Sequence, residues 1–160
     1  MTKHLVLAAI LALAACSPQQ QAAASSTAPA EITRHPVSGL EVVPLTITQD
    51  GKVHRFKVEV ARSEDEQASG LMFRKEMGAD EGMIFPRTPP DFASFWMRNT
   101  VMSLDMIFIG TDRRIINIDA NTVPYSLDSH PSQGLASAVL ELNGGRAAEL
   151  GIKPGAKVDW

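Results

Sequence analysis

Hydrophobic and polar residues alternate along two neighbouring stretches, 45–48 and 53–61, which flank the step Asp50-Gly51. An Asp-Gly step between alternating stretches is a strong signal for a β-hairpin. One face of the second stretch is apolar and the other charged, with Phe56, Val58 and Val60 on the first and Lys57 and Glu59 on the second. The pattern therefore predicts two paired strands in a sheet that has one solvent-exposed face.

Shorter runs predict the remaining strands. They span 92–98, 104–109, 114–118, 138–142 and 157–160. The run at 104–109 is apolar on both faces apart from Asp105, which is typical of a central strand covered on both sides. Residues 110–113 supply the turn that follows it.

Capping residues predict two short helices. Ser63, with Glu66 three positions later, has the form of a capping box, so a helix is expected to run to about Met72. The glycine pair at 144–145 begins a second helix, and Gly151 ends it, because glycine readily adopts the left-handed conformation after a helix. Together the elements predict an α+β fold, mainly β, with a small curved or barrel-like, largely antiparallel sheet.

The first 15 residues have the pattern of a secretory signal peptide. Lys3 and His4 precede an unbroken apolar run at 5–15. This run is too short to span a bilayer, which needs about 20 apolar residues. The residues at 13–16, Leu-Ala-Ala-Cys, resemble the lipobox of bacterial lipoproteins. We therefore expect residues 1–15 to be removed and Cys16 to carry acyl chains such as palmitate, which anchor it to a membrane. The alternative is an ordinary cleaved signal with an unmodified cysteine.

Residues 16–36 form the expected tether. They are dominated by Gln, Ala, Ser, Thr and Pro and cannot bury enough apolar surface to offset the entropy of ordering them. Residues 37–160 then fit one globular domain. Ser17 after the lipidated cysteine resembles the sorting signal for the outer rather than the inner membrane. The expected location is the periplasmic side of a membrane, with the outer membrane favoured.

Charge and residue counts exclude several classes of protein. The chain has 18 acidic and 15 basic residues, with the two signs interspersed, which argues against a nucleic-acid partner. Cys16 is the only cysteine, so an acylated chain has no thiol left for a disulfide, a metal or a nucleophile. His54 and His130 stand alone, without a second ligand at metal-binding spacing. We therefore expect neither a metal nor another cofactor.

The densest group of chemically useful residues is the segment 95–99, Phe-Trp-Met-Arg-Asn. In a strand, Trp96 and Arg98 would share one face, opposite Phe95 and Met97. An aromatic ring beside planar hydrogen-bonding groups suits a sugar or another polar ligand. The expected ligand-binding residues are Arg74, Trp96, Arg98, Asn99, Asp105 and Glu141.

A structural reading of the same residues stays open. Arg98 would pair with the partly buried carboxylate of Asp105, and Trp96 would belong to the core. Arg74 would cap the carbonyl groups at the end of the first helix.

Six short motifs lie along the domain. They are G-L-M-F-R at 70–74, G-M-I-F at 82–85, F-W-M-R-N-T at 95–100, L-D-M-I-F at 104–108, L-E-L at 140–142, and G-I at 151–152 with Gly155. In this order they resemble the domain-of-unknown-function family 192, over about residues 45–160. The resemblance implies a compact, mainly β fold and frequent export, sometimes as a lipoprotein. It implies no established catalytic activity.

Three functions remain open on this basis. The first, which we favour, is a membrane-anchored, non-catalytic module that binds an envelope glycan or another polar ligand. The second is a carbohydrate hydrolase that uses Asp105 and Glu141 as a carboxylate pair. The third is a structural or assembly lipoprotein that docks a protein partner. The positions of Trp96, Arg98, Asp105 and Glu141 distinguish them.

Overall fold

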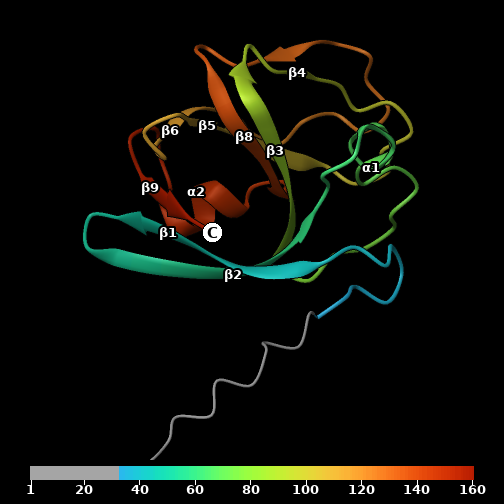
Figure 1. Cartoon of the computed structure of the whole chain (residues 1–160), viewed down its shortest axis with the longest axis horizontal. Helices are drawn as coiled ribbons and strands as arrows, with labels where there is room; N and C mark the ends of the chain where they lie inside the picture. The colour runs from blue at the N-terminus through green and yellow to red at the C-terminus, as the bar shows by residue number, and fades with distance from the viewer. Residues whose placement is uncertain (1–32) are drawn as a thin grey trace, which may run out of the picture. The chain divides into compact units, whose positions relative to one another are not determined.

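The computed structural model describes residues 33–160 (Figure 1). The expected signal peptide, Cys16 and most of the expected tether lie outside the described residues. The elements are β1 (Val42–Gln49), β2 (Lys52–Val60), α1 (Glu64–Ser69), β3 (Glu81–Asp91), β4 (Ser94–Phe95), β5 (Leu104–Gly110), β6 (Ile115–Asp119), β7 (His130–Pro131), β8 (Ala136–Asn143), α2 (Arg146–Leu150) and β9 (Lys157–Asp159).

Seven strands form one curled sheet in the order β6-β5-β8-β3-β2-β1-β9, and β4 pairs separately with β7. Neighbouring strands are antiparallel except β2 and β3, which run parallel. A bridge between Arg114 and Lys157 joins the two edges of the sheet. The α+β, mainly β prediction with a curved sheet and two short helices is therefore confirmed.

The central strands β3, β5 and β8 are covered on both faces. The inner core lies inside the curl of the sheet, where α2 also lies (Figure 1). It includes Leu45, Ile84, Ile107, Leu140, Ala147 and Val158. The outer core lies on the opposite face of these strands, against the segment 61–103, and includes Leu71, Phe85, Met97, Met106, Phe108 and Val139. A polar side chain on these strands is therefore covered by protein, whichever face of the sheet it points to.

Most of the predicted turns and helix caps are present in the structure. Residues 42–60 form the hairpin, and every residue of β5 is buried, as the apolar run predicts. Ser63 makes the reciprocal capping box with Glu66. Helix α1 ends at Ser69, three residues before the expected end, because Gly70 takes a positive φ of 45° and turns the chain.

One strand prediction is largely wrong, and one long strand was missed. Only Ser94 and Phe95 of the segment 92–98 are in a strand, which pairs with β7 rather than with the main sheet. The long strand β3 was not predicted, because double coverage removes the alternation that marks a half-buried strand. Gly82 is its most informative residue, since a Cβ there would lie 2.6 Å from the carbonyl oxygen of Glu141. This glycine permits the close approach of β3 and β8.

The N-terminal boundary of the folded unit lies a few residues before the expected position at residue 37. Arg34 bridges Glu41, and the backbone N–H of His35 donates to the carbonyl of Leu40. Within residues 33–160, neither helix is long and apolar enough to cross a membrane.

The carboxylate of Asp105 holds α2 to the sheet. It is fully buried, and its Oδ1 accepts hydrogen bonds from the backbone N–H groups of Asn121 at 2.9 Å and Gly145 at 2.8 Å. Its Oδ2 accepts from Ala147 N–H at 2.8 Å. These three amides supply what a buried carboxylate on a covered strand requires.

We expect Asp105→Asn to lower the free energy of unfolding by about 2–4 kcal/mol, because an amide NH₂ then faces a backbone donor in a buried site. Chemical denaturation measures the effect. Asp50→Asn, in the exposed hairpin turn, is the matched control and should change stability by less than about 0.5 kcal/mol. Equal stability of the two variants would contradict the anchoring role of Asp105.

Candidate functional site

A pocket with a volume of about 390 Å³ opens beside the outer core. Its walls come from the end of α1 and the turn after it, from β3, from the segment after β4 and from β8. Its lining includes Gln67, Gly70, Phe85, Trp96, Arg98 and Glu141. We call it the Glu141 pocket. It brings together three of the six residues expected to bind ligand: Trp96, Arg98 and Glu141.

Glu141 is the buried acid of this pocket. It lies on β8 opposite Met83 of β3 and Met106 of β5, and it is 5% exposed. Among residues 33–160, no group makes a hydrogen bond with its carboxyl. Burial raises the pKa of Glu141 to about 8. The carboxyl is therefore mostly neutral at pH 7 and can donate as well as accept a hydrogen bond.

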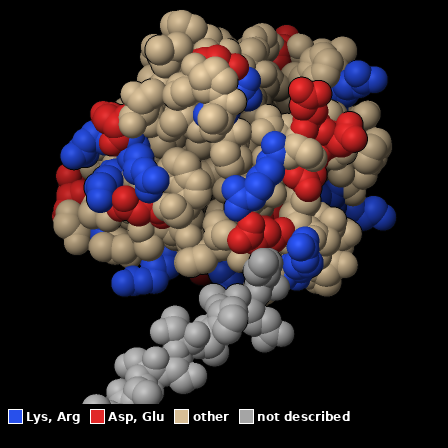
Figure 2. Space-filling view, viewed as in Figure 1, with Lys and Arg blue, Asp and Glu red and all other residues tan. Residues whose placement is uncertain are grey.

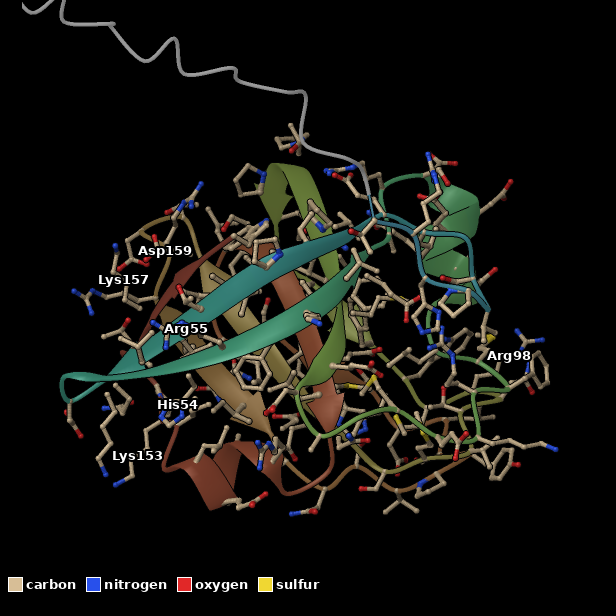
Figure 3. The ribbon with its side chains drawn as sticks, turned by 90° about the horizontal axis from the view of Figure 1, so that it is seen from below. His54, Arg55, Arg98, Lys153, Lys157 and Asp159 are labelled. Carbon is tan, nitrogen blue, oxygen red and sulfur yellow. The ribbon has the colours of Figure 1, made fainter. Side chains whose placement is uncertain are left out.

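Trp96 and Arg98 form the exposed part of the pocket wall. The guanidinium carbon of Arg98 lies 5.5 Å from the centre of the Trp96 ring, and this ring is half exposed. Met97 between them is fully buried. The predicted alternation of these side chains therefore holds, although the backbone is not a regular strand there. Figure 3 shows Arg98 at the end of the domain remote from Lys153 and Lys157.

Other lining residues were not predicted. Phe95 meets Phe85 edge to face, with ring centres 5.1 Å apart. Gln67 Nε2 donates to the carbonyl of Pro86 at 3.0 Å, which ties α1 to β3. Arg87 is paired with Asp91, with Nη2 2.7 Å from Oδ2. The expected alternation placed Phe95 on the face opposite Trp96 and Arg98. Gln67 and Arg87 carry no sequence signal, because their position at the pocket depends on the unpredicted strand β3.

Asp105 is not part of the pocket, which corrects the expected site. In the register of β5 and β8, Met106 lies opposite Glu141 and Asp105 lies opposite Leu142. Successive side chains of a strand point to opposite faces, so Asp105 and Glu141 face away from each other across the sheet. The proposed carboxylate pair of a carbohydrate hydrolase is therefore wrong. The alternative pairing of Arg98 with Asp105 is also wrong, because backbone amides occupy that carboxylate.

Arg74 makes a bidentate ion pair with Glu59, at 2.8 and 3.0 Å, instead of lining the Glu141 pocket or capping α1. Glu59 is 3% exposed and also accepts from Ser38 Oγ. The prediction that Glu59 lies on a solvent-exposed face is wrong, because these partners cover it. His35 Nδ1 lies 3.6 Å from the same carboxylate.

Asn99 is a loop residue whose backbone supports the site from outside. It has a positive φ of 55°, and its carbonyl accepts from Phe73 N–H at 2.8 Å. This bond joins the segment after β4 to the turn after α1. Asn99 is not among the residues that line the Glu141 pocket. In residues 33–160, no three His, Cys, Asp or Glu side chains converge in a way that could hold a metal ion.

Comparison with known proteins places the chain in a family. The family model DUF192, described as "Uncharacterized ACR", matches residues 45–160. The chain belongs to the DUF192 family. No curated protein matches it.

Two solved structures resemble this DUF192 chain. A protein of unknown function from Novosphingobium aromaticivorans DSM 12444 is 59% identical, with a TM-score of 0.80 over 82% of this chain and 94% of that one. A protein described as a "putative transcription regulator" from Sinorhizobium meliloti 1021 is 35% identical, with a TM-score of 0.73 over 75% of this chain and 94% of that one.

The chemistry of the pocket in this DUF192 domain is hydrogen bonding and stacking. Glu141 is the only acidic residue in its lining, and Arg87 and Arg98 are the only basic ones. Arg87 is already paired with Asp91. Both signs of charge are interspersed over the face shown in Figure 2. The arrangement therefore offers one neutral acid, one guanidinium and several aromatic surfaces to a small ligand.

The raised pKa of Glu141 predicts a pH-dependent stability in this DUF192 domain. The pKa of Glu141 is about 8 in the folded state, whereas the unfolded chain releases the proton near the ordinary pKa of 4.5. The folded state thus binds more protons between these values, so rising pH favours unfolding. Compared with Glu141→Gln, the wild type should lose roughly 1 kcal/mol of unfolding free energy per pH unit in this window.

Denaturant titrations from pH 5 to 8 measure this slope. Glu76→Gln, at an exposed position, is the control and should keep the wild-type slope. If the Glu141→Gln and wild-type slopes coincide, the buried acid is ionised at neutral pH and the assignment is wrong.

Proposed function

We propose that this domain is a non-catalytic module that binds a neutral polar ligand, of the glycan class, in the Glu141 pocket. The observation that carries the proposal is a buried carboxyl without a hydrogen-bond partner in the described structure, facing a pocket with the half-exposed ring of Trp96 at its wall. Sugars combine an apolar ring face with hydroxyl groups, so an aromatic surface and a few placed polar groups suit them. The volume of about 390 Å³ falls within the usual range for small-molecule sites.

The lining of the pocket supports binding rather than glycoside hydrolysis. That reaction ordinarily needs two carboxyl groups on either side of the scissile bond. Glu141 has no second carboxylate beside it in the lining. Its raised pKa leaves it as a hydrogen-bond donor at neutral pH rather than a base.

Replacement of Trp96 tests the binding function. We expect Trp96→Ala to weaken glycan binding by about two- to tenfold, because aromatic stacking contributes about 0.5–1.5 kcal/mol beyond buried area. The measurement is isothermal titration calorimetry of the purified protein with solubilised envelope glycans, because Trp96→Ala removes the tryptophan that a fluorescence titration would report. The chain has two tryptophans, Trp96 and Trp160, and Trp160 lies against Arg113, outside the lining of the pocket. Trp160→Phe is therefore the matched control and should retain the wild-type affinity.

No response to any envelope glycan would contradict this function and favour a second candidate, the docking of a protein partner. Exposed apolar side chains around the site favour that candidate: Phe92, Val123, Tyr125 and Leu127 are each at least 60% exposed. Their segments are joined by hydrogen bonds from Met97 N–H to Ser126 O and from Tyr125 N–H to Thr100 O.

We also propose that acyl chains on Cys16 hold the domain at the periplasmic side of a membrane, preferably the outer one. The support is the lipobox-like sequence, since each buried methylene contributes about 0.8 kcal/mol and two or more chains anchor a protein stably. Mass spectrometry should find the mature wild-type protein beginning at an acylated Cys16, in the membrane fraction. Cys16→Ser should remove the acyl chains and leave the membrane fraction or remain as unprocessed precursor. An unmodified thiol, or a retained leader in the wild type, would overturn the anchored arrangement.

A further inference from the structure

The Glu141 carboxyl is a hydrogen-bonding group in apolar surroundings. Its cross-strand neighbours Met83 and Met106 are fully buried, and Phe85 on the same pocket is 1% exposed. A polar group in such a place is stable only when a partner satisfies it. A ligand that fits must bring one hydrogen-bond acceptor to the carboxyl and apolar atoms to its neighbours.

We propose that Glu141 receives the acetamido group of an N-acetylated sugar, a proposal that rests on the glycan-binding function above. The acetamido carbonyl oxygen accepts from the carboxyl O–H, and the methyl group packs against the apolar side chains of the lining, which include Met72, Phe85 and Phe95. The sugar ring lies against Trp96.

Unmodified sugars fit this position less well. A ring without the acetyl group brings hydroxyl groups on adjacent carbons to the acid. The methionine and phenylalanine side chains offer these hydroxyl groups no hydrogen bond, and each hydroxyl left unpaired costs about 1–3 kcal/mol of binding free energy. A deacetylated amino sugar lacks the acetamido oxygen that accepts from the carboxyl, and its ammonium group shares the lining with the guanidinium of Arg98. The pocket therefore favours sugars that carry the acetyl group over sugars that lack it.

The charges around the acid make the proposed contact sensitive to pH. Arg87 on β3 and Arg98 after β4 face the pocket, while its lining residues from α1 are uncharged and the β5 neighbour is Met106. Glu141, with a pKa of about 8, is the acid in this lining that ionises as the pH rises. Its ionisation removes the donor that the acetamido oxygen needs.

Calorimetric titration of the full protein with three trisaccharides tests the proposal. The probes are the β-1,4-linked trimers of N-acetylglucosamine, glucosamine and glucose. At pH 6.5 we expect the acetylated trimer to bind at least about tenfold more tightly than the other two, the effect of one well-placed buried hydrogen bond and its apolar contacts. Its affinity should fall as the pH rises past about 8, the pKa of Glu141.

Two variants separate this contact from a general effect on the fold. Glu141→Gln keeps a neutral donor, so it should retain the preference and lose the pH dependence. Glu141→Leu should lose the preference, and its thermal midpoint reports whether it folds. If Glu141→Leu does not fold, the pH profile of Glu141→Gln decides.

The outcomes separate the two proposals. Equal binding of the acetylated and glucose trimers, an acetyl preference that persists in Glu141→Leu, or an unchanged pH profile in Glu141→Gln overturns acetamido recognition and leaves glycan binding in place. Failure of all three trimers to bind overturns acetamido recognition, and failure of the wider envelope glycans as well overturns the binding function.

Discussion

Strands β3, β5 and β8 are covered on both faces, and this double coverage decides how every polar side chain on them is accommodated. A carboxyl on a covered strand must either collect hydrogen bonds or give up its charge. Asp105 takes the first course, with three backbone amides on its two oxygens. Glu141, on the adjacent strand and the opposite face, takes the second. The strand register thus separates a carboxylate that builds the fold from an acid that faces a pocket.

The same constraint explains the ion pair of Glu59 and Arg74. Once β2 is covered by the chain before β1, a charge on it requires a partner, and the bidentate guanidinium of Arg74 supplies one. Arg74 lies on the segment that follows α1, whose residues Gly70 and Met72 form one wall of the Glu141 pocket. The ion pair therefore positions that wall of the pocket. Arg74 thus has a structural role, whereas the sequence suggested that it contacts a ligand.

Sequence patterns predicted elements whose causes are local. The Asp-Gly hairpin turn, the capping box at Ser63 and the glycine at the end of α2 each depend on residues within a few positions of one another. Strand β3 was not predicted, because it is determined by segments that are distant in the sequence. Other segments cover it, and Gly82 is required only by the approach of β8. Trp96 and Arg98 were predicted together because their alternation is local, whereas the separation of Asp105 from Glu141 depends on which strands pair and in what register.

In the proposed function, the division of the pocket between sheet and loops separates specificity from affinity. Glu141 and Phe85 project from central strands whose backbone is hydrogen-bonded to a neighbouring strand on both sides. The sheet therefore fixes the position of the acid. Trp96 and Arg98 stand on a segment held by a few backbone hydrogen bonds and are open to solvent. A rigid, apolar floor with a single donor discriminates strictly between small ligand groups. A polar ligand atom that finds no partner there has also lost its hydrogen bonds to water. An exposed aromatic wall tolerates variation, because stacking requires only a flat apolar face. Specificity should therefore reside at the floor, and affinity should be shared with the wall.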